Sequence, residues 1–426
     1  MTTVVYDLSR LSTRVLNATP NGIDWIDRLL ADHFLGMADT WPLLFGPFGP
    51  RLFAPGLLPN PTDALARQWD AAPAVPDRLV EALLRPIAPG QAAPHLDFAT
   101  PGRPRRIAAA LGEYGLKIGA KPASAAPRGA IYLNATHYPL ESPRHTAWLD
   151  ARADVKPVFF VHDLLPVAAP ETFWRGEPER HARRLALLAR RGAGAIVTTR
   201  AVAAHLAEHM RDLGRPDLPI LQAHPPVAPI FRAPGTPDPR LAGVTYFVAY
   251  GTIEPRKNHL LLVEAWRRLI ADMGAKAPKL VVVGKRGWQS EEIVAALGDP
   301  ALGGAVIEVG GLSNGGLRAL LAGARALLAP SFGEGYGLPL AEALAAETPA
   351  ICSDIPPFRE IAGETACYLD PRRPDDWAER IKSFAEDPAI REGARAALRG
   401  YQPFAPEDWF AAIDGFLGQI AAVAAD

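Results

Sequence analysis

Short apolar segments alternate with helical segments throughout the second half of the chain, and this alternation limits the fold more than any other feature. The apolar segments are rich in Val, Leu and Ile, which is typical of buried strands. Near-continuous apolar strands of this kind form parallel sheets that helices cover on both faces. The predicted strands are 246–250, 280–283, 306–309, 326–329, 350–352 and 366–369, and the predicted helices lie around 260–273, 291–296, 317–322 and 358–361.

The first half of the chain shows the same kinds of segment with less regular spacing. Residues 41–62 are dense in Pro, Phe and Gly, which predicts an irregular apolar loop that either packs under the domain or faces an apolar partner. Prolines are also frequent in 222–239, which indicates a hinge between two lobes. The remaining predictions are strands at 4–8, 130–133, 158–161 and 195–199, and helices at 23–35, at 182–189, from Thr199 onward and at 408–425.

Composition excludes several classes of protein. The formal net charge is −1 and charged residues make up 21% of the chain, so no global charge favours a nucleic-acid partner. No apolar run reaches the ~18 residues that a membrane span needs, and the N-terminal MTTVVYDLSR lacks the apolar core of a signal peptide. We therefore expect a cytoplasmic protein. Its cysteines, Cys352 and Cys367, are expected to be reduced core thiols.

One loop in the second half of the chain contains more candidate ligand-binding residues than the neighbouring loops. It follows the predicted strand 326–329, contains alternating glycines, and ends where Pro339 opens an Ala- and Leu-rich helix. Glycines let a backbone approach a ligand closely, and the free amides of a helix start attract anions. Two carboxylates frame the turn, Glu334 within the loop and Glu342 in the first turn of the helix. This layout suits a phosphate-bearing ligand whose sugar hydroxyls need acceptors.

The spacing Glu334-x7-Glu342, with Gly-Tyr-Gly-Leu-Pro between the acids, resembles the signature of retaining glycosyltransferases of the GT4-like group. The alternative is an ordinary turn with two surface acids; the glycines, the proline and the flanking strands favour the resemblance. In that family the first Glu contacts the donor sugar and the second contacts the ribose of the nucleotide. The resemblance implies nucleotide-binding roles for the residues between them, Gly335, Tyr336, Gly337 and Leu338.

The same resemblance implies the GT-B architecture, an α/β fold with two Rossmann-like doubly wound parallel-sheet domains facing a central cleft. In such proteins the C-terminal helix crosses back to the first lobe. The expected domains are an acceptor-binding domain at 1–230, a nucleotide-sugar-binding domain at 238–405, and a C-terminal helix at 406–426 that packs on the first domain.

A pair of adjacent cations follows the predicted strand 246–250. The segment 251–258, Gly-Thr-Ile-Glu-Pro-Arg-Lys-Asn, resembles the family's phosphate-binding segment, which implies that Arg256 and Lys257 grip the diphosphate with Thr252 beside them. Charge-assisted contacts of this kind contribute about 1.5–3 kcal/mol each. A solvated surface pair is the alternative. Some glycosyltransferases use a metal held by a D-x-D pair instead; the chain contains no D-x-D, so no metal is expected.

His162 follows the predicted strand 158–161. A lone histidine is more often structural, but residues just past the carboxyl end of a strand in an open α/β sheet lie where ligands bind. The run VFFVHDLLPVAAPETF resembles the family segment whose histidine points at the donor sugar or phosphate, which implies that role for His162. Asp163 is expected to be a turn or helix-cap residue.

Three further loops are predicted to border the ligand. The turn after strand 306–309, with Gly311 and Leu312, is expected to contact the nucleotide base. Gly22 lies where the family has a glycine-bearing loop that faces the cleft. The loop 284–288 either adds a cation or a stacking indole from Trp288, or is a plain turn.

Together these features predict a retaining, metal-independent hexosyltransferase that moves a sugar from a nucleotide sugar, with GDP-mannose as the best guess, to a glycan or lipid-linked acceptor. Glu342 would anchor ribose, and the predicted catalytic residues are His162, Glu334, Arg256 and Lys257.

Several alternatives stay open at this stage. The donor is a UDP-sugar, the protein is a non-catalytic scaffold subunit that binds a nucleotide sugar, or it is another GT-B enzyme such as an epimerase or a phosphorylase. His205 and His209 fit an H-x-x-E-H zinc-peptidase pattern, but no acid downstream is set out as a third ligand. The basic segment 101–128 is equally consistent with a membrane-facing surface and with a solvated helix face.

Overall fold

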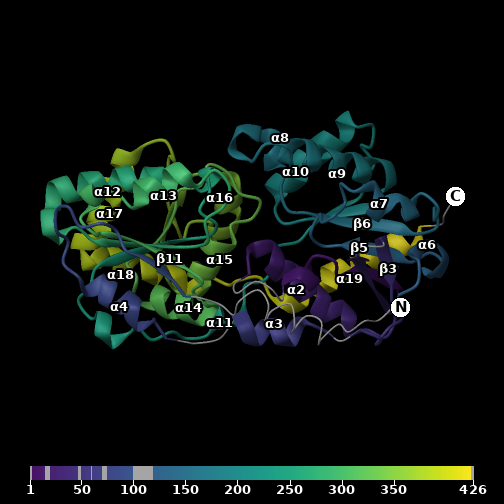
Figure 1. The fold of residues 1–426 in the computed structure, drawn as a ribbon, viewed down its shortest axis with the longest axis horizontal. Helices are drawn as coiled ribbons and strands as arrows, with labels where there is room; N and C mark the ends of the chain where they lie inside the picture. The colour runs from purple at the N-terminus through teal and green to yellow at the C-terminus, as the bar shows by residue number, and fades with distance from the viewer. Residues whose placement is uncertain are drawn as a thin grey trace.

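The computed structural model describes residues 2–14, 20–46, 49–58, 60–69, 74–98 and 119–423. Within these ranges the chain forms two α/β domains side by side, each built on one seven-stranded sheet (Figure 1). The strand order is β3-β2-β1-β5-β6-β7-β8 in the first sheet and β14-β13-β12-β9-β10-β11-β4 in the second. Strands pair in parallel throughout both sheets, except that β2 and β3 are antiparallel. The predicted fold class is confirmed.

Most of the strands lie where the apolar segments predict them. The first sheet contains β1 (Val4–Asp7), β2 (Thr40–Gly46), β3 (Gly49–Leu52), β5 (Ile131–Asn134), β6 (Lys156–Val161), β7 (Gly194–Val197) and β8 (Ile220–Gln222). The second contains β4 (His95–Asp97), β9 (Tyr246–Tyr250), β10 (Lys279–Val283), β11 (Val306–Gly310), β12 (Leu327–Ala329), β13 (Ala350–Ser353) and β14 (Cys367–Leu369).

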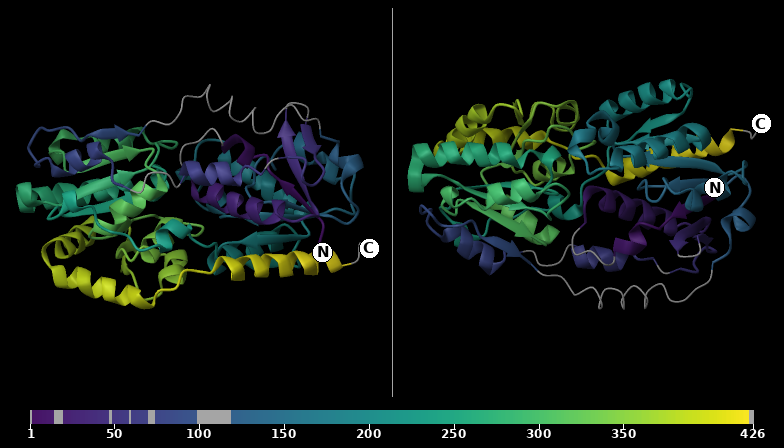
Figure 2. Two further views of the ribbon diagram at one scale, coloured as in Figure 1. Left: turned by 90° about the horizontal axis from the view of Figure 1, so that it is seen from below. Right: turned by 45° about the horizontal axis from the view of Figure 1, so that its top comes forward.

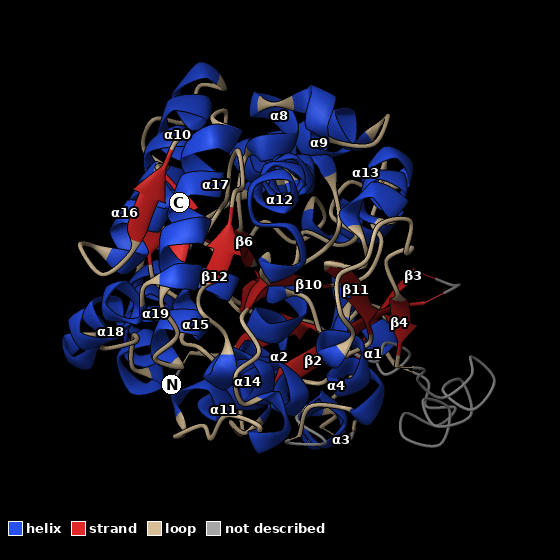
Figure 3. Cartoon of the chain, turned by 90° about the vertical axis from the view of Figure 1, so that its left-hand side faces the viewer, coloured by secondary structure: helices blue, strands red, loops and turns tan. Residues whose placement is uncertain are grey.

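Helices cover the faces of both sheets, and a view along the long axis shows them around the strands (Figure 3). The described helices in the first part of the chain are α1 (Leu11–Arg14), α2 (Gly22–Leu35), α3 (Thr62–Trp69), α4 (Asp77–Leu84), α6 (Pro122–Ala125), α7 (Pro143–Thr146), α8 (Leu165–Ala168), α9 (Glu177–Arg191) and α10 (Arg200–Asp212). Those in the second part are α11 (Pro229–Arg232), α12 (His259–Met273), α13 (Glu291–Leu297), α14 (Asn314–Gly323), α15 (Leu338–Ala345), α16 (Pro356–Ala362), α17 (Pro374–Glu386), α18 (Pro388–Ala397) and α19 (Pro406–Ala422). Among the described residues, no helix is both long and apolar enough to cross a membrane.

Each sheet has one point at which the chain changes the direction in which it adds strands. In the first sheet that point lies between β1 and β5, and in the second it lies between β9 and β12. The connections on the two sides of such a point leave in opposite directions, which opens a crevice at the carboxyl ends of the two strands. The loops after these four strands are therefore the natural places for binding residues.

The C-terminal helix α19 leaves the second domain and packs on the first, as predicted (Figure 2). Its apolar face includes Trp409, Ile413 and Phe416, which join the buried cluster that contains strands β1, β5 and β6. The fit is close, because a Cβ added at Gly194 on β7 would lie 2.8 Å from the Phe416 ring. The ammonium of Lys156 donates to the carbonyls of Ile420 (3.2 Å) and Ala421 (2.9 Å), where the helix dipole favours a cation.

The predicted boundary of the first domain is wrong for one segment. Strand β4 pairs in parallel with β11 at the edge of the second sheet, with Leu96 opposite Val309. Helix α4, which precedes it, buries Leu79 and Leu83 in the core of the second domain. The first 230 residues are therefore not one continuous domain. A three-residue strand with a single apolar side chain carries no periodic pattern, so the sequence could not show this crossing.

The prediction of an irregular loop at 41–62 is also wrong, because β2 and β3 form a hairpin there. The prediction took the prolines as signs of a loop, but Pro42 and Pro50 lie within the two strands. Pro50 is tolerated because β3 is the outermost strand, where a missing N–H faces no partner strand. Most of the basic segment 101–128 lies outside the described residues; Lys121 and Arg128, which are described, are exposed.

Docking of α19 should contribute measurably to stability. Ile413 is fully buried, so we expect Ile413→Ala to lower the free energy of unfolding by about 2–5 kcal/mol. Gln419→Ala, on the exposed side of the same helix, is the matched control and should change it by less than about 0.5 kcal/mol. Urea unfolding followed by circular dichroism measures both. Equal effects of the two substitutions would show that the helix is not held by this apolar face.

Candidate active site

A cavity of about 600 Å³ lies between the two domains. Its first wall comes from the start of α2, the loops after β1, β5 and β6, and α9. Its second wall comes from the loops after β9, β10, β11 and β12 and from the start of α15. Every residue that the sequence assigns to the site lines this cavity: His162, Glu334, Arg256, Lys257, Glu342, Gly335, Tyr336, Gly337, Leu338, Thr252, Gly311, Leu312 and Gly22. Their roles toward a ligand stay predictions.

The loop after β12 reaches the first domain because Gly335 has no side chain. A Cβ at this position would lie only 2.0 Å from the carbonyl oxygen of His162. The carbonyl of Gly335 accepts hydrogen bonds from the hydroxyls of Thr198 (2.9 Å) and Thr199 (3.0 Å) across the domain boundary. This contact places Glu334, one residue earlier, beside the strand end that carries His162.

Glu334 lies at the centre of a buried charge cluster. Its two carboxylate oxygens are 2.7 Å from Arg256 Nη1 and 2.6 Å from Lys257 Nζ, and the Ser331 hydroxyl donates to it at 2.7 Å. The other side of Arg256 is 2.6 Å from Glu254. Burial alone would raise the pKa of the Glu334 carboxyl, but Lys257 and Arg256 outweigh burial and lower that pKa to about 2.

The cluster is internally neutral, with two carboxylates and two cations in contact. The predicted diphosphate grip of Arg256 and Lys257 is thus occupied by Glu334 in the ligand-free protein. An anionic ligand in the cavity would compete with the Glu334 carboxylate for these cations. Sequence analysis missed Glu254 as the second partner of Arg256, although the two are only two residues apart.

Glu342 has very different surroundings. Its carboxylate accepts a hydrogen bond from the Tyr250 hydroxyl (3.1 Å), which also donates to the carbonyl of Pro339 (2.8 Å). Burial raises the pKa of Glu342 to about 8, and the Tyr250 hydrogen bond opposes this only in part. Helix α15 begins beside it after Gly337, whose φ of 105° is a left-handed conformation that favours glycine. Glu342 is thus protonated at neutral pH in the ligand-free protein, and a hydrogen-bond donor from a ligand would favour its charged form.

His162 is neutral and fixed in orientation. Its Nε2 lies 2.7 Å from the carbonyl oxygen of Ala135, so Nε2 carries the hydrogen and Nδ1 is the acceptor. Burial lowers the pKa of His162 to about 4. A neutral ring of this kind suits a sugar hydroxyl better than a phosphate. Asp163 accepts from the Leu165 N–H (3.1 Å) at the start of α8, which confirms the predicted turn role.

Trp288 bridges the domains at the edge of the cavity. Its indole stacks on Phe173 with ring centroids 5.7 Å apart, and its Nε1 donates to the carbonyl of Thr172 at 3.0 Å. At the predicted base site, a Cβ on Gly311 would lie 2.5 Å from the carbonyl oxygen of Phe98, which follows β4. The segment that crosses from the first half of the chain therefore packs against the base site.

Sequence reasoning missed several residues that line the cavity. His137 and His181 come from the loop after β5 and from α9, and Tyr250 ends β9. The signal for His137 was its place after the predicted strand 130–133, the same argument that identified His162. His181 carried no such signal, because it lies inside a helix with ordinary periodicity.

The fold and the cleft define a class of protein, the GT-B class with two Rossmann-like domains. The crystal structure of HepE from Anabaena in complex with UDP-glucose superposes with a TM-score of 0.60, at 13% identity, over 98% of this chain and 99% of that one. The pneumococcal O-GlcNAc transferase GtfA, solved with UDP and GlcNAc, gives a TM-score of 0.50 over 69% of this chain and 57% of that one, also at 13% identity.

Residues 240–400, which hold most of the second domain, match the family described as Glycosyl transferases group 1. The mannosyltransferase WbdA of Escherichia coli is 32% identical over 240 residues, 53% of this chain and 29% of that protein. O-antigen chain mannosyltransferase B, also of Escherichia coli, is 32% identical over 157 residues, 37% of this chain and 41% of that protein. The chain thus matches less than half the length of these relatives.

Glu334 occupies the place beside Arg256 and Lys257 that a ligand anion would take, and removal of its carboxylate tests this role. Glu334→Gln leaves Arg256 and Lys257 with too little negative charge, and breaking one side of a buried pair costs about 3–5 kcal/mol. We expect a lower melting temperature than in the wild type, and a larger stabilisation by GDP, whose phosphates restore the anion. The higher melting temperature of the wild type should be lost as the pH falls from 4.5, the ordinary pKa of this carboxyl, toward about 2, its pKa in the folded protein.

Glu364→Gln, an exposed acid, is the control for this experiment and should leave both melting temperature and GDP response unchanged. Differential scanning fluorimetry with and without GDP measures all three proteins. An unchanged melting temperature of Glu334→Gln, or a smaller GDP response than in the wild type, contradicts the stand-in role.

Glu342 should make the ligand-free protein less stable as the pH rises. Its pKa is about 8 in the folded protein against an ordinary 4.5, so the folded state keeps a proton that the unfolded state loses, and stability falls across that interval. Glu342→Gln removes this loss. We expect the variant to melt at least about 2 °C above the wild type at pH 8 and close to it at pH 4.5. A difference that shrinks with rising pH would refute the raised pKa.

Proposed function

We propose that the protein is a retaining, metal-independent glycosyltransferase that moves a hexose from a nucleotide sugar to a glycan or lipid-linked acceptor. The observation that carries the proposal is the Glu334–Arg256–Lys257 cluster at the crevice between β9 and β12. Two cations held at a strand-order reversal, facing a neutral histidine on the other domain, suit a diphosphate joined to a sugar. The proposal includes a cytoplasmic location, with the basic segment 101–128 contacting the membrane where the acceptor is lipid-linked.

Binding of the donor exchanges one anion for another. The diphosphate takes the place of the Glu334 carboxylate on Arg256 and Lys257, and Glu334 turns to accept hydroxyls of the donor sugar. Glu342 accepts a ribose hydroxyl in the place where only Tyr250 now donates to it. The nucleotide base lies along Gly311 and Leu312.

The transfer step needs no separate base. The bond between the anomeric carbon and the phosphate oxygen breaks, the acceptor oxygen bonds to that carbon on the same face, and its proton passes to the departing phosphate. Arg256 and Lys257 offset the charge that develops on the leaving diphosphate, and fixed charge of this kind is usually the largest catalytic contribution. His162 offers its Nδ1 lone pair to a hydroxyl of the reacting sugar.

Mannose from GDP-mannose is the donor that we favour. Its support is the set of curated relatives named as mannosyltransferases, WbdA and O-antigen chain mannosyltransferase B. A UDP-sugar is the second candidate, because the Anabaena HepE structure holds UDP-glucose in the same fold. A non-catalytic scaffold subunit that only binds the nucleotide sugar is the third.

Thermal shift with nucleotides tests the proposal first. GDP, UDP, ADP and their sugars are each added with Mg²⁺ or with EDTA to the wild type, Lys257→Ala and the exposed control Lys276→Ala. We expect one nucleotide family to stabilise the wild type and Lys276→Ala equally, with or without EDTA. Lys257→Ala should lose about tenfold or more in affinity, since a charge-assisted hydrogen bond contributes about 1.5–3 kcal/mol.

The outcomes separate the candidate functions. Transfer of the sugar to a glycan acceptor, with retained anomeric configuration by NMR, supports the enzyme. Binding of a nucleotide sugar without turnover favours the scaffold. Stabilisation that EDTA abolishes contradicts metal independence, and no response to any nucleotide refutes the proposal.

A further inference from the structure

The loop after β5 has a strained backbone at His137, which lies at the strand-order reversal of the first sheet. Its φ is 64°, a left-handed conformation that few side chains adopt, although His is among those that tolerate it best. Such strained positions persist only where the surroundings fix them, and they concentrate at functional sites. The question is what fixes this one, and for what purpose.

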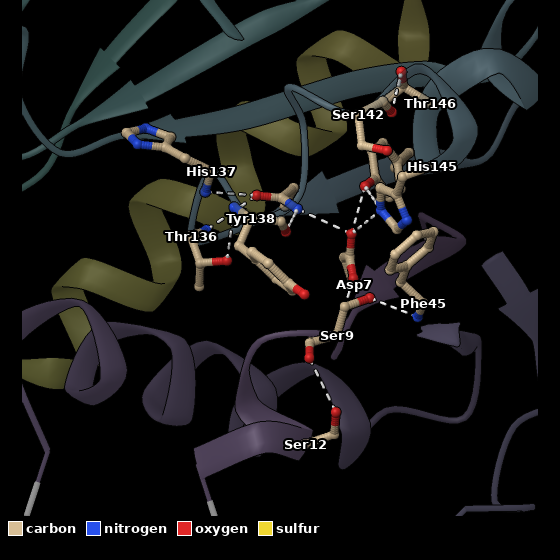
Figure 4. A network of polar contacts seen from close by, with 12 residues as sticks. Asp7, Ser9, Ser12, Phe45, Thr136, His137, Tyr138, Ser142, His145 and Thr146 are labelled. Carbon is tan, nitrogen blue, oxygen red and sulfur yellow. Dashed lines mark hydrogen bonds and ion pairs between the residues drawn. The ribbon is translucent and has the colours of Figure 1, made fainter. Parts of the chain in front are cut away.

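Asn134, the last residue of β5, fixes the loop through its side chain. Its partners in the loop, Thr136, His137 and Tyr138, are labelled in Figure 4. Its Oδ1 accepts from the N–H groups of Thr136 (3.1 Å) and His137 (2.9 Å). Its Nδ2 donates to the carbonyl of Tyr138 (3.0 Å). These bonds involve only the backbone of the loop, so the conformation of residue 137 does not depend on the identity of its side chain.

Asn134 is itself anchored by a buried carboxylate on the neighbouring strand. Asp7 Oδ2 accepts from Asn134 Nδ2 (2.9 Å), from the Tyr132 hydroxyl (2.6 Å) and from His145 Nε2 (2.8 Å) (Figure 4). Burial opposes the charge on Asp7, but His145 and the hydrogen bonds outweigh burial and lower the pKa of this carboxyl. A fully buried network of this kind holds the loop rigidly at the end of β5.

The imidazole that this loop presents is part of the cavity wall. His137 lines the cavity and is 9% exposed, and within the described residues its buried Nε2 has no hydrogen-bond partner. The His181 ring lies 5.4 Å away, and its Nε2 is also buried without a partner among the described residues. The ring of His162 lies 5.3 Å from that of His137. Both histidines line the same cavity, so a ligand that enters it lies beside their rings.

The imidazoles of this wall are neutral. Burial lowers the pKa of His137 well below its ordinary value, and His162, His181, Arg184 and Arg10 lower it further. Burial also lowers the pKa of His181 to about 4. A neutral imidazole offers one N–H donor and one acceptor nitrogen, which matches a hydroxyl group that both donates and accepts. The nearby cations are engaged elsewhere, Arg10 with Asp24 and Arg184 with two glutamates.

We propose that His137, with His181 beside it, binds hydroxyl groups of a sugar substrate on the first-domain side of the cleft. The reaction in which the sugar takes part rests on the proposed function, whereas the ability of this wall to bind hydroxyl groups does not. The sugar is either the transferred hexose of the donor or the sugar of the acceptor. Both present hydroxyls, and the experiment below distinguishes them.

Replacement of His137 by glycine separates binding from folding. His137→Gly keeps every backbone hydrogen bond to Asn134 and removes the strain at φ 64°. Its melting temperature should therefore fall only by what the lost contacts of the ring cost. Glu347→Gly is the matched control: its φ is 54°, it is exposed, and it lies outside the cavity. Both variants are compared with the wild type by calorimetric titration and by initial rates.

The titration uses GDP and GDP-mannose, and UDP and UDP-glucose if those stabilise the wild type instead. A loss of about tenfold in affinity for the nucleotide sugar, with unchanged affinity for the nucleoside diphosphate alone, assigns His137 to the donor sugar. Unchanged donor binding with a tenfold loss in kcat/KM for the acceptor assigns it to the acceptor sugar. Glu347→Gly should match the wild type in both measurements.

Equal sugar-dependent binding and equal rates in His137→Gly and the wild type overturn the inference. If the wild type binds no nucleotide at all, the proposed function fails, and the inference is then tested by saturation-transfer NMR with methyl α-D-mannopyranoside. A signal in the wild type that His137→Gly abolishes and Glu347→Gly retains supports a sugar-binding wall. A signal that all three proteins share, or that none shows, refutes it.

Discussion

The contact of Glu334 with Arg256 and Lys257 joins the two loops that border the crevice of the second sheet, and the ligand-free cleft depends on it. Backbone and side-chain bonds reinforce the same junction: Phe332 N–H donates to the carbonyl of Arg256 (3.0 Å), and the Asn258 amide donates to Pro330 (3.1 Å). Arg256 and Lys257 are thus paired within the protein when no ligand is bound. On the proposed function, the diphosphate of the donor would replace Glu334 on these cations, and sugar hydroxyls would replace the cations on the carboxylate.

The first domain meets this cluster of charges with a wall that carries neutral imidazoles, and the difference follows from the two strand-order reversals. At the second sheet the loops carry charges in contact with one another. At the first sheet Asp7 is buried beneath the loop and serves to hold it, and imidazoles line the cavity beside arginines that are paired with acids. The two walls touch where Gly335 meets His162, since a Cβ on Gly335 would lie 2.0 Å from the His162 carbonyl oxygen. A ligand with a charged half and a hydroxyl-rich half is complementary to such a cleft.

The sequence predicted most of the second domain because its strands are buried on both faces and read as continuous apolar runs; β9 was placed at 246–250 without error. It failed where pairing is non-local or the pattern is short. Strand β4 joins a sheet whose other strands begin some 150 residues later in the chain. The residues of β4 themselves carry no pattern that predicts its pairing with β11. The site residues were predictable as a set because they follow strand ends, but their pairings were not: only the structure shows that Glu334 occupies the cations, and that Glu254 shares Arg256.

Several groups in the cleft are held in states that the fold alone would not favour. Glu342 is a buried carboxyl without a cation, and His137 combines a left-handed backbone with an unpaired ring nitrogen. Each lowers the stability of the ligand-free protein, and each lies in the same cavity. At other places the fold offsets the cost of a buried charge, as where Lys156 caps α19 or Asp7 receives three donors. On the proposed function, one ligand would contact both walls of the cavity, with its ribose toward Glu342 and a sugar toward His137.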